Sequence, residues 1–264
     1  MKLGFIGSGN MARAIIGGII ERGIMAPGDI VASSPVSEER KLVSDTFGIE
    51  VVESNSYVID NSDIVFFAVK PNVIPVVVEE IKDIVTDDKL IISIVAGKTL
   101  EWYKEAFGRT VKLIRTMPNT PALVGEGMTG VSPNEAVKEE DLEKAMKLLS
   151  SFGKAEVIPE KLMDAVVSVS GSSPAYVFMM IEAMADGAVK LGMPRDKAYT
   201  FAAQAVMGSA KMVLETGRHP AELKDMVCSP AGTTIAAVQV LEEAGFRAGL
   251  IDAMEACAEV SRSL

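Results

Sequence analysis

The feature that most constrains the fold of this chain is a glycine-rich turn between an apolar run and a helical pattern. Residues 3–6, LGFI, are typical of a buried strand, and residues 10–22 have the apolar spacing of a helix. Between them, Gly7, Gly9 and Ala12 match the pattern G-x-G-x-x-A. Gly7 permits a tight turn, Gly9 lets a ligand approach the backbone, and Ala12 lets the helix pack closely. The context predicts a turn that binds phosphate at a helix N-terminus.

Strand-like and helix-like segments alternate through the first 158 residues. Further strands are expected at 29–33, 50–52, 63–69, 89–95 and 110–116, and helices at 37–47, 71–84 and 99–107. The alternation predicts an α/β domain, a Rossmann-like doubly wound parallel sheet, over residues 1–158. The pieces 129–133 and 154–158 are expected to form a hairpin-like or edge element around a charged helix at 135–150.

From residue 159 the strand patterns end, and helical stretches are separated by Gly and Pro. Residues 175–189 are apolar nearly all round, so this helix should be buried on every side. A domain of this size has little room to bury such a helix alone. We therefore predict that residues 159–264 form an all-helical domain that dimerises.

Composition excludes several classes of function. The formal net charge of −10 offers no basic face to nucleic acid or to a membrane. A single histidine and two cysteines are too few for a His-based or Cys-rich metal site, so no metal is expected. The start of the chain does not resemble a signal peptide, and no apolar run reaches the length of a membrane span. The sequence therefore predicts a cytoplasmic protein with reduced thiols.

The end of the second predicted strand favours NADP(H) over NAD(H). An NAD site usually has an acidic residue there for the ribose 2′-hydroxyl. Here Ser33 and Ser34 occupy that place, and no carboxylate is expected to repel a 2′-phosphate. Arg40 and Lys41 follow a few residues later as candidate cations. NAD(H) remains an alternative, because no arginine comes directly after the strand.

Three isolated polar features have structural interpretations that compete with functional ones. Arg115 ends a predicted buried strand and is expected to form a structural ion pair rather than to bind a carboxylate. Glu182 and Asp186 share one helix face, and we expect cations of a neighbouring helix to pair with them. His219, before a proline, is expected to be a loop or cap residue rather than a catalytic acid.

The segment CSPAGTT, residues 228–234, contains more turn-forming residues than one helix cap requires. A helix N-terminus offers unpaired N–H groups and a partial positive charge, which suit a carboxylate in a chain of net charge −10. We interpret the segment as both a helix start and the wall of a binding site.

The segments ASSP, AVKP, MPNTP, SGSSPAYVF and LKDMVCSPAGTTIAAVQVLEE, in this order, resemble the pyrroline-5-carboxylate reductase family. The resemblance covers essentially the whole chain, and the last segment is its most specific part. Thr233 stands where many members have alanine. The resemblance implies an enzyme that uses NAD(P)H to reduce 1-pyrroline-5-carboxylate to L-proline, the last step of proline biosynthesis. It also implies a homodimer formed by the helical domain, with dimers assembling into larger rings.

The same resemblance assigns site residues. It implies that the small-molecule substrate lies against Ser229, Gly232, Thr233 and Thr234, with the catalytic Thr234 hydroxyl on the ring nitrogen and backbone amides on the carboxylate. Cofactor contacts are expected from the glycine turn and from the ends of four strands; these residues are Ile6, Gly7, Ser8, Gly9, Asn10, Met11, Ala12, Ser33, Ser34, Asn55, Ala68, Val69, Lys70, Pro71, Ala96 and Gly97. Asn55 could instead cap a helix, and Lys70 could be a solvated lysine.

Two other functions remain open at this point. A β-hydroxyacid dehydrogenase-like oxidoreductase would carry a lysine early in the long helix that enters the second domain, yet residues 170–189 contain none. A catalytically silent NADP(H)-binding regulator would need the cofactor turn but not the 228–234 segment. An assay for substrate-dependent oxidation of the cofactor distinguishes the second alternative.

Overall fold

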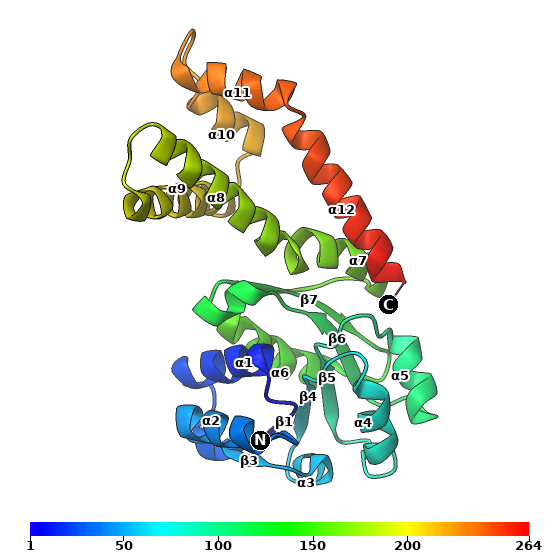
Figure 1. Ribbon diagram of the computed structural model, residues 1–264. Coiled ribbons are helices and arrows are strands. Elements are labelled where there is room, and N and C mark those ends of the chain that lie inside the picture. The colour runs from blue at the N-terminus through cyan, green and yellow to red at the C-terminus, as the bar shows by residue number, and fades with distance from the viewer. Residues whose placement is uncertain (264) are drawn as a thin grey trace. The chain divides into compact units, whose positions relative to one another are not determined.

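The computed structural model describes residues 1–263, and its contacts divide the chain into two compact units (Figure 1). The first unit comprises Met1–Ser172 together with the chain from Cys257 onward, and the second comprises Ser173–Ala256. The boundary between these compact units, after Ser172, differs from the domain boundary expected between residues 158 and 159. The latter was placed where the strand patterns end and the helical domain is expected to begin, and it stays a prediction.

One eight-stranded sheet forms the centre of the first unit, in the order β3-β2-β1-β4-β5-β6-β7-β8. Strands β1 to β6 are mutually parallel, as the alternating pattern predicts. The strands are β1 (Leu3–Ile6), β2 (Ile30–Ser33), β3 (Glu50–Val52), β4 (Ile64–Phe67), β5 (Leu90–Ser93), β6 (Leu113–Met117), β7 (Gly127–Pro133) and β8 (Gly153–Val157).

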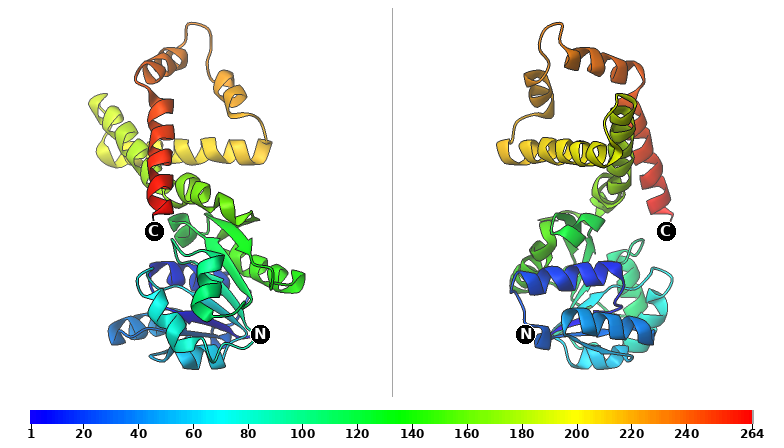
Figure 2. Two further views of the ribbon diagram at one scale, coloured as in Figure 1. Left: turned by 90° about the vertical axis from the view of Figure 1, so that its right-hand side faces the viewer. Right: turned by 60° about the vertical axis from the view of Figure 1, so that its left-hand side comes forward.

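Helices cover both faces of this sheet, because successive strand residues point to opposite sides and most of them are apolar. One face packs against α1 (Asn10–Glu21), α2 (Ser37–Phe47) and α6 (Glu139–Leu149) (Figure 2). On this face the rings of Phe5 and Phe66 stack with their centroids 4.9 Å apart. The other face packs against α3 (Asn55–Asp60), α4 (Ile74–Ile81) and α5 (Leu100–Phe107). The predicted doubly wound fold class is therefore confirmed.

The end of the sheet and two helical connections differ from the sequence predictions. Strand β7 runs antiparallel to β6, whereas β7 and β8 are parallel and are joined by α6. Of the two predicted alternatives, the hairpin is therefore wrong and the edge element is confirmed, with β8 as the edge strand. A helix between two strands allows them to be parallel, which a short hairpin turn does not. No range was predicted for helix α3, although Asn55 was considered as a helix cap, since six residues carry little periodic signal. Helix α4 is shorter than the predicted 71–84.

Short helical segments complete the first unit. They are η1 (Pro27–Asp29), η2 (Thr120–Val124), η3 (Ser150–Phe152), η4 (Glu160–Leu162), α7 (Met163–Val166) and the π-helix η5 (Val167–Gly171). The last turn of α12, from Cys257, also belongs to this unit, and there the Ser261 hydroxyl donates to Asp164 Oδ1 at 2.8 Å. This contact ties the final turn of the chain to the start of α7.

The second unit is helical, as predicted. Its elements are α8 (Ser173–Lys190), α9 (Arg195–Thr216), α10 (Pro220–Met226), α11 (Thr233–Glu243) and the larger part of α12 (Phe246–Arg262). The predicted Gly and Pro breaks coincide with the helix ends; Gly217, for example, ends α9 in the left-handed conformation. Across residues 1–263, none of the helices is long and apolar enough to cross a membrane.

Within one chain, α8 is not buried on every side as predicted. Its buried residues are Pro174 and Ala185, whereas Phe178 and Met179 are 63% and 69% exposed. Helix α9 likewise buries Ala198 and Ala202 but exposes larger apolar side chains. A helix of this composition gains stability only when another surface removes those side chains from water.

We expect Gly153→Ala to destabilise the edge of the sheet. Gly153 has φ 151°, and a Cβ there would lie 2.0 Å from the carbonyl oxygen of its strand partner Gly127. Because the neighbouring atom is backbone, it cannot move aside cheaply, and the cost should be about 3 kcal/mol or more. Chemical denaturation measures it, with Gly28→Ala as the control, since a Cβ at Gly28 meets no atom within 4 Å. Equal effects of the two substitutions would contradict this account of Gly153.

Candidate functional site

The glycine turn after β1 lies at the point where the order of the strands reverses. Strand β1 pairs with β2 on one side and with β4 on the other. The Gly7 amide donates to the Ser33 carbonyl at 3.1 Å, and the Ala68 amide donates to the Ile6 carbonyl at 2.9 Å. In open α/β sheets, ligands bind beyond the carboxyl ends of the strands at such a switch point.

Gly7 must be glycine for two reasons. Its φ is 97°, and a Cβ would lie 2.6 Å from the carbonyl oxygen of Ala68. A side chain would therefore be strained in conformation and would also push against the end of β4. The close approach of the turn after β1 to the end of β4 thus determines where α1 begins.

The residues of this turn fit a pyrophosphate. A Cβ on Gly9 would meet no protein atom within 4 Å, so the space above this residue is open. Gly9 is the N-cap of α1 without a side-chain cap, which leaves the first N–H groups of the helix available. The Ser8 hydroxyl is 99% buried and has no hydrogen-bond partner within residues 1–263. Ala12 is buried against the sheet, as predicted, while Asn10 and Met11 form the first turn.

At the end of β2, Ser33 and Asn55 join three elements. The Ser33 hydroxyl donates to Asn55 Oδ1 at 2.7 Å, and Asn55 Nδ2 donates to Glu80 Oε2 of α4 at 2.8 Å. The cap of α3 is Ser54, which accepts from the Tyr57 amide, so the alternative of Asn55 as a cap is wrong. Asn55 instead holds the wall of the crevice beside β2.

Ser34 has a neighbour that the sequence did not predict. Its buried hydroxyl donates to Glu39 Oε2 at 2.5 Å and accepts from the Val36 amide at 3.3 Å. Arg40, one of the two candidate cations, donates to the Ser34 carbonyl at 2.8 Å. The expectation that no carboxylate stands at this position is therefore wrong, because the first turn of α2 brings Glu39 back to the end of β2.

The remaining predicted cofactor residues follow β4 and β5, which are neighbours in the sheet. Ala68 and Val69 are half-buried, whereas Lys70 and Pro71 are exposed beyond β4. Ala96 and Gly97 follow β5, and Gly97 has φ 75°. The structure thus places all five groups of predicted residues at the carboxyl ends of the adjacent strands β3, β2, β1, β4 and β5.

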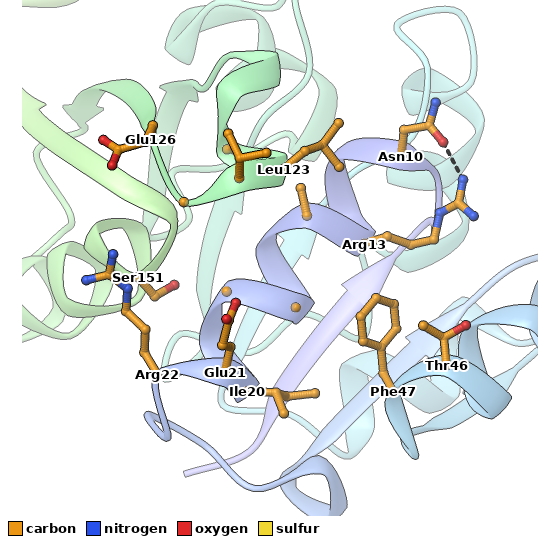
Figure 3. A pocket seen from close by; sticks show the side chains of 16 residues that line it. Asn10, Arg13, Ile20, Glu21, Arg22, Thr46, Phe47, Leu123, Glu126 and Ser151 are labelled. Atoms are coloured by element: carbon orange, nitrogen blue, oxygen red, sulfur yellow. Dashed lines mark hydrogen bonds between the residues drawn. The ribbon is translucent and has the colours of Figure 1, made fainter. Parts of the chain in front are cut away.

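A pocket of about 980 Å³ lies along the outer side of α1 (Figure 3). It is lined by α1, the end of α2 and the 122–126 segment, and it reaches the glycine turn only at Asn10. There the Arg13 guanidinium donates to Asn10 Oδ1. We locate the candidate site at the strand ends rather than in this pocket, because the strand ends combine an open backbone cradle at Gly9 with the unpartnered Ser8 hydroxyl. Arg13 is a cation beside the cradle that was not predicted from the sequence.

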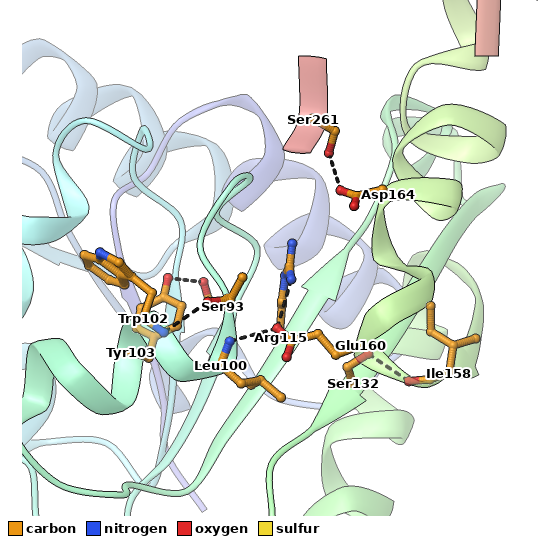
Figure 4. Close-up of polar contacts among 11 residues, drawn as sticks. Ser93, Leu100, Trp102, Tyr103, Arg115, Ser132, Ile158, Glu160, Asp164 and Ser261 are labelled. Atoms are coloured by element: carbon orange, nitrogen blue, oxygen red, sulfur yellow. Dashed lines mark hydrogen bonds and ion pairs between the residues drawn. The ribbon is translucent and has the colours of Figure 1, made fainter. Parts of the chain in front are cut away.

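Arg115 forms the structural ion pair that was predicted. Its guanidinium is 2.9 Å from Glu160 Oε1, which also accepts from the Leu100 amide at 2.8 Å (Figure 4). On the other side of β5, Ser93 and Tyr103 share a hydrogen bond of 2.6 Å, and burial raises the pKa of Tyr103 above its usual value. These side chains join β5, β6 and α5 behind the strand ends.

In the second unit, α11 begins as the sequence predicted, with a helix start that no side chain caps. Gly232 is the N-cap and its amide donates to the Ser229 carbonyl at 3.0 Å. A Cβ on Gly232 would lie 2.3 Å from the Ser229 hydroxyl oxygen. Ala231 has φ 56°, a strained conformation for a residue with a side chain. The N–H groups of the first turn, from Thr233 onward, therefore have no intrahelical acceptor and remain available to a ligand.

The cations closest in sequence to this helix start are already paired. Lys224 contacts Asp225, and Arg247 is 2.7 Å from Glu242. An anion at the start of α11 would thus be held by backbone N–H groups rather than by an unpaired cation.

The competing structural interpretations in this unit are largely confirmed. His219 caps α10 by accepting from the Ala221 amide at 3.2 Å. Asp186 pairs with Arg195 at the start of α9, whereas Glu182 is exposed.

A phosphate cradle at the switch point of a Rossmann sheet, followed by a helical unit, defines a dinucleotide-binding protein of the two-domain oxidoreductase class. Residues 2–97 match the family described as NADP oxidoreductase, coenzyme F420-dependent, and residues 160–264 match pyrroline-5-carboxylate reductase dimerisation. Pyrroline-5-carboxylate reductase of Escherichia coli (strain K12) is 56% identical over 263 residues, covering 100% of this chain and 98% of that protein. The chain belongs to the pyrroline-5-carboxylate reductase family.

Solved structures agree with this assignment. A pyrroline-5-carboxylate reductase from Coxiella burnetii has a TM-score of 0.92 at 34% identity and covers 99% of this chain and 97% of that one. The Plasmodium falciparum pyrroline carboxylate reductase, which has NADP bound, has a TM-score of 0.90 at 32% identity and covers 100% and 97%. The predicted resemblance is therefore confirmed over both units.

We expect Gly9→Ala to weaken dinucleotide binding without unfolding the chain. The backbone of Gly9 is extended, with φ −66° and ψ −173°, and its Cβ would meet no protein atom. The added methyl group would fill the space that a pyrophosphate needs, so Kd for NADP⁺ should rise about tenfold or more. Calorimetry measures Kd, and the thermal midpoint should stay within about 3 °C. Gly17→Ala is the control on the same helix, where the Cβ makes ordinary contact with Phe47. Unchanged binding in Gly9→Ala would show that the cradle is not the pyrophosphate site.

Proposed function

We propose that this chain uses NADPH to reduce 1-pyrroline-5-carboxylate to L-proline, the last step of proline biosynthesis. The observation that carries the proposal is the presence, in one chain, of an open dinucleotide cradle at Gly9 and an uncapped helix start at Gly232. The 56% identity to a pyrroline-5-carboxylate reductase over 100% of the chain supports the assignment of both features to one reaction.

In this proposal the cofactor is NADP(H), with NAD(H) as an alternative. The first turn of α1 and the buried Ser8 hydroxyl bind the pyrophosphate, because the N–H groups of that turn have no side-chain cap and the hydroxyl has no other hydrogen-bond partner in residues 1–263. Ser34 and Arg40 lie where the 2′-position of the adenosine ribose is expected. The residues after β4 and β5, from Ala68 to Pro71 and at Ala96 and Gly97, line the rest of the dinucleotide path.

The substrate is a small cyclic imine that carries a carboxylate. Its carboxylate binds the unpaired N–H groups at the start of α11, where the helix dipole adds a partial positive charge. Ser229 and Gly232 shape the turn, because their close contact leaves no room for a side chain at residue 232. Thr233 is exposed on the first turn, and the half-buried Thr234 directs its hydroxyl to the ring nitrogen.

The reaction requires little acid strength from the protein. NADPH, when bound, supplies a hydride to the carbon of the C=N bond. A protonated imine is already electrophilic, so the protein contributes mainly orientation of the ring and a dry, fitted site. Thr234 holds the nitrogen in place, and its hydroxyl can pass on a proton from water. Neither a metal nor the single histidine, which caps α10, is needed for these steps.

The proposal also covers assembly and location. Residues 1–158 bind the dinucleotide, and residues 159–264 bind the substrate and form a homodimer, with dimers joining into larger rings. The match of residues 160–264 to a dimerisation domain and the exposed apolar side chains of α8 support the homodimer. A cytoplasmic location is part of the proposal, and the low count of two cysteines, too few for a disulfide framework, supports it.

Thr234→Val should depress turnover about 100-fold while Kd for NADPH stays within about twofold. The variant keeps the shape of the side chain but removes the hydroxyl that orients the ring nitrogen. The assay mixes protein, NADPH and pyrroline-5-carboxylate and follows absorbance of the reduced nicotinamide. The control is Thr46→Val, whose exposed hydroxyl bonds only within α2, to the Leu42 carbonyl at 2.6 Å.

Two results would contradict this assignment. If the unaltered protein binds NADPH tightly but does not oxidise it with this substrate, the chain is a silent NADP(H)-binding regulator. If Thr234→Val weakens turnover and cofactor binding equally, the residue is structural. A β-hydroxyacid dehydrogenase-like activity is disfavoured, since α8 carries no lysine before Lys190.

Phe178→Asp should convert the homodimer into monomers. Phe178 is 63% exposed on α8 within one chain, and burial of a charge in its place at an interface would be costly. Light scattering coupled to size-exclusion chromatography measures the mass, which should fall to that of one chain, 28.1 kDa. The control is Val76→Asp on α4, a residue 70% exposed in the first unit, which should leave the mass unchanged. A dimeric Phe178→Asp protein would place the interface elsewhere.

A further inference from the structure

The hydroxyl of Ser34 is fully engaged in the structure. Its proton is donated to Glu39 Oε2 at 2.5 Å, and its oxygen accepts from the Val36 amide at 3.3 Å. Ser34 is only 1% exposed, so its side chain has few other orientations. The hydroxyl can donate to a phosphate oxygen only after it has left the Glu39 carboxylate.

The charges around the end of β2 are predominantly negative. Glu39 lies on Ser34, Glu80 accepts from Asn55, and the Glu53 carboxylate is 3.7 Å from the Arg40 guanidinium. Arg40 donates to the Ser34 carbonyl, so its positive charge is shared between Ser34 and Glu53. Of these three carboxylates, Glu53 is the one that contacts the Arg40 guanidinium, and Glu39 is the one that contacts Ser34.

We propose that Glu39 determines the preference of this chain between NADPH and NADH. The inference rests on the proposed dinucleotide site. A carboxylate at the end of the second strand accepts a hydrogen bond from a ribose 2′-hydroxyl and repels a 2′-phosphate. Glu39 supplies that carboxylate from α2. It therefore lowers the affinity for NADP(H), to which Ser34 and Arg40 contribute, and it reduces the difference between the affinities for NADP(H) and NAD(H).

A purely structural role for Glu39 makes a different prediction. Glu39 is the third residue of α2, where an acidic side chain often reaches back to the residues before the helix and is favoured by the helix dipole. In that role the residue stabilises α2 and has no influence on the cofactor. Glu39→Gln separates the two roles, because glutamine keeps an acceptor oxygen for Ser34 but has no charge.

The experiment measures Kd of NADP⁺ and of NAD⁺ for the full chain by calorimetry at low ionic strength. Glu39→Gln should lower the Kd of NADP⁺ about tenfold. This is the effect expected from removing one negative charge a few ångströms from a phosphate in a largely hydrated site. The Kd of NAD⁺ should stay the same or rise up to about threefold, through the weaker acceptor for the 2′-hydroxyl. Salt should reduce the gain for NADP⁺, because ions screen the repulsion that has been removed.

The control is Glu38→Gln, which removes the same charge from the adjacent position. Glu38 is exposed and accepts from Ser37 at 3.1 Å, not from Ser34. It should leave the ratio of the two dissociation constants within about twofold. Glu39→Ala is the second variant and should shift the ratio in the same direction as Glu39→Gln.

Three outcomes would overturn the inference. An unchanged ratio in a folded Glu39→Gln protein would leave Glu39 with only its structural role. An equal shift of this ratio in Glu38→Gln would mean that any negative charge at the start of α2 has the same effect, whether or not it contacts Ser34. If the unaltered protein binds neither nucleotide, the proposed function itself fails, which the wild-type measurement reveals before any variant is made.

Discussion

The close contact between the turn after β1 and the end of β4 determines where most of the candidate site lies. Gly7 can approach the Ala68 carbonyl only because it has no side chain, and its amide is bonded to Ser33 of β2 at the same time. This double attachment fixes the direction in which α1 starts and brings the ends of β1, β2 and β4 into one crevice. The open space above Gly9 and the unpartnered Ser8 hydroxyl are consequences of that geometry.

The second unit depends on a different constraint, the burial of apolar surface. Helices α8 and α9 bury small side chains such as Ala185 and Ala198 between them and leave Phe178, Met179 and Phe201 exposed within one chain. Helices α10, α11 and α12 have no buried residues at all in the described chain. Such a unit cannot derive much stability from its own core, so its fold and its self-association are expected to be coupled.

Much of this arrangement could be predicted from the sequence, since its signals are local. Short runs of β-branched and aromatic residues located the six parallel strands, and glycine and proline located the ends of the long helices. The direction of β7 could not be predicted, because it depends on the path of the chain between β6 and β7, which contains the short segment η2 and no crossover helix, rather than on the residues of β7 itself. Glu39 was missed for a similar reason. It lies five residues after Ser34, and only the turn at Pro35 and Val36 brings its carboxylate back to the strand.

The two proposed ligand sites share one physical solution to the problem of binding anions in a chain of net charge −10. Each uses a helix start without a side-chain cap, at Gly9 for the pyrophosphate and at Gly232 for the substrate carboxylate. Backbone N–H groups bind an anion without adding a full positive charge to the site. They do not, however, distinguish a phosphate from a carboxylate. Selectivity must therefore come from the side chains around each helix start. At the ribose end of the first site, the Glu39 carboxylate lies beside Ser34 and Arg40, so we propose that the chain discriminates between dinucleotides by where it places negative charge.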